Sequence, residues 1–258
     1  MISQEILKLE NINFSVTRNN RLVNILDNIS FTIFNGEIFG ITGESGAGKT
    51  SLGKIICGLE TPTSGKKFFE GKEFFSIAPN HKIQFLFQDY YSFHDPLQKI
   101  NSAFNEILSL KKTKSETFKL KKEILNTVGL GDDVLQLYPK NLSGGQLQRL
   151  ALAKLLLVNP TLLILDEPFS SQDLISISNL IKLILRLNQK LQNTFICISH
   201  DIPFLMKLCD RIMIMKEGKI EEIIKNDKIT KTFESPTKDY TKFLFQAFDT
   251  KFNFNLNS

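Results

Sequence analysis

Residues 38–50 read IFGITGESGAGKT, an apolar run that passes into a glycine-rich segment and ends on Lys49 and Thr50. The apolar run is typical of a buried strand, and the residues that follow, with Leu52 and Ile55 on one face, have helical spacing. Residues 43–50 fit the pattern G-x-x-x-x-G-K-[ST] in the strand–loop–helix context that this motif needs. Glycines let backbone N–H groups approach phosphates, and the helix N-terminus adds a partial positive charge. The stretch therefore predicts a nucleotide-phosphate site.

Each polar group of this loop has an expected role. Lys49 is expected to meet the β- and γ-phosphates, and the Thr50 hydroxyl is expected to ligate Mg²⁺. The alternative, a fortuitous glycine-rich turn, is disfavoured because a strand precedes the motif and a helix follows it. The pattern predicts a P-loop NTPase, but it does not choose among the many kinds. The expected ATP-binding residues of the loop are Gly43, Glu44, Ser45, Gly46, Ala47, Gly48, Lys49 and Thr50.

A second apolar stretch ends on adjacent carboxylates. Residues 161–167 read TLLILDE, which places Asp166 and Glu167 at the C-terminal end of a predicted strand. Ligands of open α/β sheets bind at this edge. We expect Asp166 to hold Mg²⁺ and Glu167 to polarise the attacking water. Two adjacent acids also occur in solvated turns, an alternative that weakens once a phosphate loop is present.

Composition limits the class of protein. The 258 residues suffice for one large α/β domain, and no apolar run approaches the length of about 18 residues that a spanning helix needs. We therefore expect membrane contact to come through partners. The net charge of +5 is scattered, which favours a mixed solvated surface over a nucleic-acid or lipid patch. Cys57, Cys197 and Cys209 form no CxxC pair and are expected to be reduced, buried thiols.

The remaining pattern indicates an N-terminal antiparallel β subdomain and an inserted α-helical subdomain around a mainly parallel sheet. Alternating residues before position 34 predict half-buried strands, and apolar runs at 83–87 and 194–198 predict buried ones. Residues 99–140 are rich in Lys and Glu and favour helices. A hairpin is expected around Glu217 and Gly218. The tail after Lys231 has no clear period, so no element is predicted there.

The most specific motif lies at residues 142–146, which read LSGGQ. Ser143 can cap a helix whose bare glycine backbone makes a second anion-binding start, so two nucleotides shared by two subunits are expected. Here residues 5–223 resemble the ABC ATPase family, whose signature is LSGGQ. The resemblance implies that the signature of one subunit meets the γ-phosphate of ATP held by the other. It adds Ser143, Gly144, Gly145 and Gln146 to the expected ATP-binding residues.

Other family elements follow in the expected order. Gln88 resembles the Q-loop glutamine, which implies contact with Mg²⁺ and the attacking water. His200 resembles the switch histidine, which implies a place at the γ-phosphate beside the catalytic Glu167. Asp173 occupies the D-loop position, which implies an ATP-site role across the dimer interface. The family usually has Leu before that Asp, and this chain has Gln172.

The family's adenine-stacking aromatic residue has no plain counterpart. Val16 occupies its expected position, and Phe14 lies two residues earlier on the same strand face. Phe14 is as well explained as part of the core as it is as a base platform, so both interpretations stay open.

A narrower resemblance, to the peptide/nickel importer branch, implies the assembly. It implies an ABC ATPase domain over residues 5–225, with a helical subdomain at about 90–158 inserted and a C-terminal extension over residues 226–258. It also implies two membrane permease subunits, a second ATPase subunit in a hetero- or homodimer, an extracellular binding protein and a peripheral place on the cytoplasmic face of the inner membrane. The stretches that carry this resemblance are residues 43–50 with Leu52 and Gly53, residues 62–65, residues 85–89 with Pro96, and residues 234–241, whereas the segment from Tyr90 to Pro96 departs from the usual sequence of the branch.

The resemblance therefore favours an ATP-hydrolysing importer subunit with no direct contact with nucleic acid. The alternative is a soluble ABC-type ATPase acting on nucleic acid or ribosomes. That alternative is disfavoured because only about a hundred residues, without sustained heptads, separate the two glycine-rich motifs. A subunit that binds ATP without turnover conflicts with the presence of Lys49, Asp166, Glu167 and His200.

Overall fold

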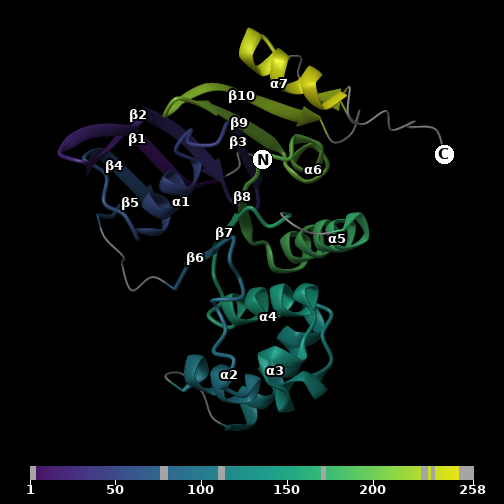
Figure 1. Cartoon of the computed structure of the whole chain (residues 1–258). Coiled ribbons are helices and arrows are strands. Elements are labelled where there is room, and N and C mark those ends of the chain that lie inside the picture. The colour runs from purple at the N-terminus through teal and green to yellow at the C-terminus, as the bar shows by residue number, and fades with distance from the viewer. Residues whose placement is uncertain are drawn as a thin grey trace.

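The computed structural model describes residues 4–75, 81–109, 114–169, 173–227, 232–233 and 236–249. Two β-sheets occupy the upper half of the molecule, and a group of helices forms the lower half (Figure 1). The smaller sheet has the order β2-β1-β4-β5, and its neighbouring strands are antiparallel, as predicted for the N-terminal part. Its strands are β1 (Glu5–Arg18), β2 (Arg21–Phe34), β4 (Ser64–Phe69) and β5 (Lys72–Glu73).

The larger sheet has the order β11-β10-β9-β3-β8-β7-β6, in which the five strands from β9 to β6 are parallel. The β9–β10 pair is the predicted antiparallel hairpin. The strands of the larger sheet are β3 (Ile38–Gly43), β6 (Ile83–Leu86), β7 (Leu162–Asp166), β8 (Thr194–Ile198), β9 (Arg211–Lys216), β10 (Lys219–Asp227) and β11 (Thr232–Phe233).

The larger sheet is covered on both faces, which explains its apolar strands. Successive side chains of a strand point to opposite faces. Accordingly, Leu163 and Leu165 of β7 belong to one hydrophobic core, whereas Leu162 and Ile164 belong to the other. The first core is formed with α4 (Gly144–Leu156), α5 (Leu174–Leu191) and α6 (Ile202–Leu208), and the second with α1 (Lys49–Cys57) and the smaller sheet.

The helices of the lower half lie between β6 and β7 in the chain. They are α2 (Ile100–Leu108), α3 (Lys114–Thr127), the 3-10 helices η1 (Asp132–Gln136) and η2 (Pro139–Asn141), and α4. Their shared core includes Phe104 and Leu125, both fully buried. Among the described residues, no helix combines the length and the apolar composition needed to cross a bilayer.

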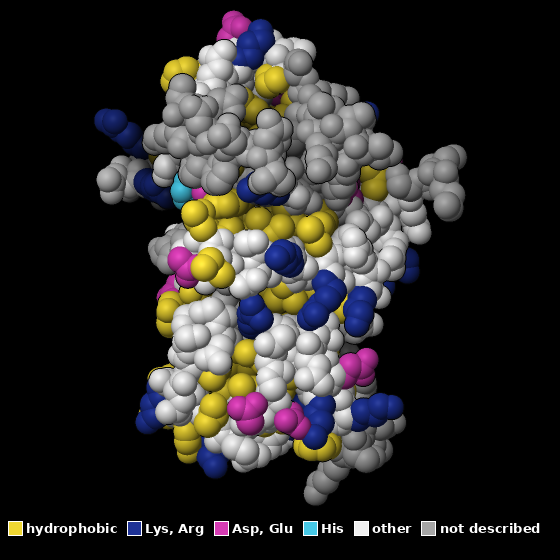
Figure 2. Space-filling model, turned by 90° about the vertical axis from the view of Figure 1, so that its right-hand side faces the viewer, with side chains coloured by type: hydrophobic (Ala, Val, Ile, Leu, Met, Phe, Trp, Pro, Cys, Tyr) yellow, Lys and Arg dark blue, Asp and Glu magenta, His cyan; other side chains and the backbone are white. Residues whose placement is uncertain are grey.

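Two elements differ from the prediction. Where the tail after Lys231 showed no clear period, the structure has the short strand β11 and the helix α7 (Asp239–Asp249), which lies beside β10 at the top of the molecule (Figure 1). The helix is held by tertiary packing, since Tyr240 and Leu244 rest against the main core. On the face shown in Figure 2, Lys and Arg side chains are interspersed with uncharged ones, which agrees with the predicted mixed surface.

Candidate nucleotide-binding site

The glycine-rich loop connects β3 to α1, as the motif predicts. Gly43 has φ 144°, and a Cβ at that position would stand 2.1 Å from the carbonyl oxygen of Met215 on the neighbouring strand. Only glycine therefore lets the chain leave the sheet here. Gly48 caps α1 with φ 92° and no side-chain cap, so the first N–H groups of the helix stay available to an anion.

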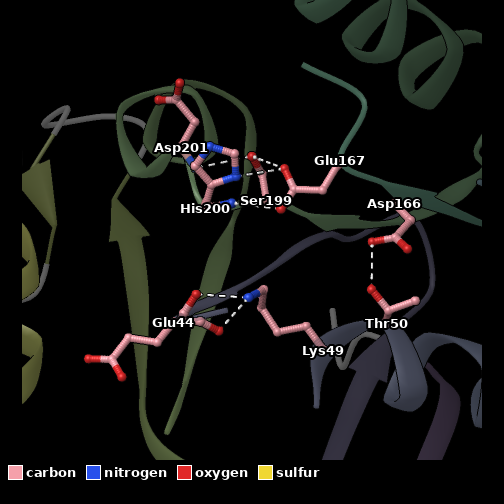
Figure 3. Close-up of polar contacts among 9 residues, drawn as sticks. Glu44, Lys49, Thr50, Asp166, Glu167, Ser199, His200 and Asp201 are labelled. Carbon is pink, nitrogen blue, oxygen red and sulfur yellow. Dashed lines mark hydrogen bonds and ion pairs between the residues drawn. The ribbon is translucent and has the colours of Figure 1, made fainter. Parts of the chain in front are cut away.

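Lys49 lies at the start of α1 and turns back over the loop. Its Nζ donates to the carbonyl oxygens of Gly43 at 2.8 Å and of Glu44 at 2.9 Å (Figure 3). The side chain is buried, and burial lowers the pKa of its ammonium group, while the negative charges of Glu167 and Asp166 act in the opposite direction. The loop therefore places the ammonium group of Lys49 beside backbone N–H groups that can bind phosphate.

Thr50 and Asp166 come together from different elements. The Thr50 hydroxyl donates to Asp166 Oδ1 at 3.3 Å, at the C-terminal end of β7. Asp166 is 5% exposed, and burial raises the pKa of its carboxyl group, partly offset by the hydrogen bond from Thr50. A hydroxyl and a carboxylate oxygen are the donor types that Mg²⁺ prefers, so this pair fits the predicted metal role.

Glu167 faces the loop that follows β8. Its carboxylate Oε2 lies 3.0 Å from His200 Nδ1 and accepts from the Ser199 hydroxyl at 3.4 Å, and its Oε1 accepts from the His200 N–H at 3.2 Å (Figure 3). The backbone of Glu167 has φ 49°, an uncommon conformation for a side chain of this kind, and its N–H donates to Ile198. Ser199 was not among the predicted site residues, although it lies directly before His200.

The predicted residues thus separate into two groups. The structure brings Lys49, Thr50, Asp166, Glu167 and His200 to one edge of the sheet (Figure 3). Gln88 is exposed just after β6, and within the described part of the chain its side chain makes no hydrogen bond to this group.

The signature residues begin α4, in the lower half of the molecule, whereas α1 lies in the upper half (Figure 1). Ser143 caps α4: its Oγ accepts from the N–H of Gln146, and its own N–H donates to Gln146 Oε1 at 2.9 Å. Gly145 is exposed and Gly144 is half-buried at the first positions of the helix. The signature therefore presents a capped, glycine-lined helix start away from the phosphate loop of its own chain.

Asp173 caps α5. Its Oδ1 accepts from the N–H of Ser176 at 2.8 Å and its Oδ2 from the Ser176 hydroxyl at 2.7 Å, and these bonds lower the pKa of the carboxyl group. The neighbouring Gln172 lies outside the described residues. Phe14, the candidate base platform, is half-buried on β1 against the second core, so both interpretations of it remain open.

The segment after Gln88 is fastened along α4. His94 Nε2 donates to the carbonyl oxygen of Leu147 at 3.1 Å, and Lys154 Nζ donates to that of Phe93 at 3.3 Å. Burial, followed by the positive charge of Lys154, lowers the pKa of His94 to about 4, so the ring is neutral near pH 7. Tyr91 is 57% exposed, and its hydroxyl lies against Gly144. These contacts, which the sequence did not reveal, tie the segment to the signature helix.

The far end of α1 is also held by a cation. Lys67 of β4 is 2% exposed, and its Nζ donates to the carbonyl oxygen of Ile55 at 2.8 Å and lies 4.5 Å from the ring centroid of Phe74. Burial lowers the pKa of Lys67 to about 8. A buried ammonium group at the carbonyl end of the helix complements the helix dipole whose other end faces the phosphate loop.

Known proteins share both the sequence and the fold. The family described as ABC transporter matches residues 26–170. The oligopeptide transport ATP-binding protein OppF of Bacillus subtilis (strain 168) is 32% identical over 95% of this chain and 83% of that protein. The nickel import ATP-binding protein NikE of Shigella sonnei (strain Ss046) is 37% identical over 80% of each.

Solved structures agree with these matches. The dimeric, post-hydrolysis structure of the ATP-binding cassette MJ0796 bound to ADP and Pi is 26% identical, has a TM-score of 0.75 and covers 85% of this chain and 98% of that one. The structure of cbiO1 from Clostridium perfringens, part of the ABC transporter complex cbiONQ, is 25% identical, has a TM-score of 0.79 and covers 96% and 95%.

Proposed function

We propose that this chain, which belongs to the ABC transporter family, powers an importer of peptides or nickel. It is an ATP-binding, ATP-hydrolysing cassette, and the site described above would supply the energy for import. The observation that carries this proposal is the group of Lys49, Thr50, Asp166, Glu167 and His200 at one edge of the sheet. Its relative OppF is named an oligopeptide transport ATP-binding protein and NikE a nickel import ATP-binding protein, which favours transport over action on nucleic acid.

The phosphate loop is proposed to bind the nucleotide. Lys49 leaves the carbonyl oxygens of Gly43 and Glu44 and turns its ammonium group to the β- and γ-phosphates. Thr50 and Asp166 hold Mg²⁺, which would neutralise charge on the phosphate oxygens when bound. Burial lowers the pKa of the Lys49 ammonium group and raises that of the Asp166 carboxyl group, so an opposite charge beside each, phosphate for Lys49 and Mg²⁺ for Asp166, would favour the loaded site.

Glu167 is proposed to orient and polarise the water that attacks the γ-phosphate in line. In the structure its carboxylate is engaged by Ser199 and His200, so the carboxylate is already positioned before nucleotide arrives. His200 would then turn toward the γ-phosphate, so that its ring exchanges one anionic partner, the Glu167 carboxylate, for another. Catalysis of this kind rests on positioning and electrostatic stabilisation.

The second half of the site is proposed to come from another ATPase subunit. The start of α4 at Ser143 lies apart from the phosphate loop of its own chain, and its exposed glycines suit an anion. The ATP site of each subunit would thus be completed by the signature and Asp173 of the other subunit. We propose that the partner is a different chain, because Gln172 replaces the usual Leu beside Asp173. A tight ATP-induced homodimer with full activity, detected by light scattering and phosphate release, would contradict this pairing.

The segment from Gln88 to Pro96 is proposed to receive a cytoplasmic helix of a permease subunit. The contacts of His94 and Lys154 fasten this segment to α4, so a push from the permease moves the signature with it. Tyr91→Ala should therefore abolish transport and co-purification with the permease while ATP binding stays unchanged. The matched control is Phe118→Ala, which removes an aromatic ring of similar exposure, 54%, from α3.

The hydrolytic site has its own test. Thr50→Val removes the hydroxyl at nearly constant shape and should lower Mg²⁺-dependent phosphate release by at least about tenfold. Thr61→Val, at an exposed position beyond the other end of α1, is the control and should leave the rate unchanged. Equal rates in the two variants would contradict the placement of the metal at Thr50.

A further inference from the structure

Ser199 places a fully buried hydroxyl group beside the carboxylate of Glu167 (Figure 3). The hydroxyl donates to Glu167 Oε2 at 3.4 Å, and the same oxygen accepts from the N–H of Asp201 at 3.1 Å. A serine hydroxyl has one hydrogen to donate and two lone pairs that accept. Since the Asp201 N–H approaches a lone pair, the hydrogen is left to point toward the carboxylate.

The backbone of Ser199 is fixed to the strand that leads into the phosphate loop. Its N–H donates at 3.0 Å to the carbonyl oxygen of Ile41, which belongs to β3 and lies two residues before Gly43. The N–H of Glu167 donates in turn to the carbonyl oxygen of Ile198 at 2.8 Å. Hydrogen bonds of the sheet therefore hold both residues, and the sheet determines the distance between the hydroxyl and the carboxylate.

His200 contacts the same carboxylate but has more freedom to move. Its Nδ1 lies 3.0 Å from Glu167 Oε2, and its side chain is 68% exposed, whereas Ser199 is fully buried. The backbone N–H of His200 donates to Glu167 Oε1 at 3.2 Å and stays in place when only the ring turns. After the ring turns toward the γ-phosphate, Oε1 therefore keeps the backbone N–H and Oε2 keeps the Ser199 hydroxyl.

We propose that Ser199 is a positioning residue that keeps the Glu167 carboxylate oriented once the His200 ring has turned away. This rests on the proposed role of Glu167 in polarising the attacking water. A carboxylate has about four lone-pair positions, so the one on Oε2 that the ring leaves becomes open to water. The Ser199 hydroxyl and the His200 N–H meanwhile oppose rotation of the carboxylate. Such positioning acts on the rate of the chemical step rather than on nucleotide affinity.

The first test compares Ser199→Ala with Thr194→Val in steady-state phosphate release by the full chain with Mg²⁺. Thr194 is also fully buried, begins β8 at the end opposite to Ser199, and accepts through Oγ1 from the N–H of Gly36 at 2.9 Å. Each variant removes one buried hydroxyl and leaves one backbone N–H unpaired, so both should unfold at lower urea. Only Ser199→Ala should lower kcat, by at least about tenfold, the loss expected for one hydrogen bond to a charged group. Its KM should stay within about threefold.

Two further variants show whether Ser199 acts through Glu167. Ser199→Thr keeps a hydroxyl at the same position and should restore kcat to within about threefold of the unaltered chain. In a Glu167→Gln background, Ser199→Ala should lower the residual rate by less than about threefold, because the carboxylate that the hydroxyl orients is already gone.

A smaller loss of kcat in Ser199→Ala overturns the proposal, and so does an equal loss in Thr194→Val. A larger fall in the Glu167→Gln background overturns it as well, since the hydroxyl would then act without the carboxylate. If Ser199→Thr unfolds at lower urea than the unaltered chain, the comparison of Ser199→Ala with Thr194→Val decides. Glu167→Gln alone separates this proposal from the one beneath it. If that variant turns over ATP normally, the role of Glu167 is wrong; if it loses turnover and Ser199→Ala does not, only the role of Ser199 is wrong.

Discussion

Glu167→Gln separates the chemistry of the site from its architecture. The carboxylate meets the Ser199 hydroxyl at 3.4 Å, the His200 N–H at 3.2 Å and His200 Nδ1 at 3.0 Å. An amide of the same shape can keep these contacts: its oxygen accepts from the His200 N–H, and its NH₂ group donates to Nδ1 and to the Ser199 oxygen. What the amide loses is the negative charge that polarises water.

The two effects therefore differ in size. Loss of a positioned base typically costs about 10²-fold to 10⁴-fold in rate, which corresponds to about 2.7 to 5.5 kcal/mol in the barrier. Because the neighbouring hydrogen bonds are replaced rather than lost, the free energy of unfolding should change by less than about 1 kcal/mol. ATP affinity should stay within a few fold, since Lys49 and the loop that contact the phosphates are unchanged.

The assay combines steady-state phosphate release, binding of a fluorescent ATP analogue and urea denaturation. Glu217→Gln, at the exposed β9–β10 turn, is the matched control, since it makes the same chemical change away from the site and should leave all three quantities unaltered. Turnover of Glu167→Gln within tenfold of the unaltered chain would show that another group activates the water. A large loss of stability would refute the argument that the amide fits.

Lys49→Ala should lose ATP affinity in the isolated chain, whereas Ser143→Arg should spare it and block only ATP-dependent assembly with the second ATPase subunit; equal losses in binding would argue against a shared site. Burial lowers the pKa of Lys67 in the folded chain to about 8, from the value of 10.5 expected in the unfolded chain. Between these two pH values the unfolded chain binds more protons, so the contribution of Lys67 to the free energy of unfolding rises from about pH 8 to 10.5. Lys67→Met should flatten that rise in urea denaturation, and an unchanged slope would contradict the buried cation. Gly43→Ala, which sets a Cβ against the backbone, should unfold at lower urea than Gly46→Ala, which meets open space and should cost about 1 kcal/mol; the opposite order would refute the contact argument.

The sequence predicted the elements whose pattern is local. The apolar runs of β3, β7 and β8 follow from strands buried on both faces, and the glycines after Gly43 follow from the chemistry of phosphate binding. The hairpin around Gly218 was predicted from its turn residues. Such features need only neighbours in the chain, so one stretch of residues carries the whole signal.

Other features could not be found in this way. No period marks α7, because its inward face is short and its first turn is satisfied by Glu222, a residue of a different element. The buried Lys67 gave no signal either, since a lysine in a strand is ordinarily exposed and only the carbonyl end of α1 and the ring of Phe74 explain its burial. Both features depend on contacts between elements that lie far apart in the sequence, and the sequence alone does not show which elements become neighbours.

By itself the sequence determined which groups are available: a lysine at the start of a helix, and carboxylates and a histidine at the ends of strands. Only the tertiary structure decided which of them touch. The strand order places β8 between β3 and β7, so Ile198 pairs with Asp166 on one side and with Ile41 on the other. That neighbourhood brings His200 onto Glu167 and sets both beside the phosphate loop. The physical reason is that the hydrogen bonds between parallel strands join residues that are far apart in sequence. Such strands become neighbours only when the whole sheet assembles.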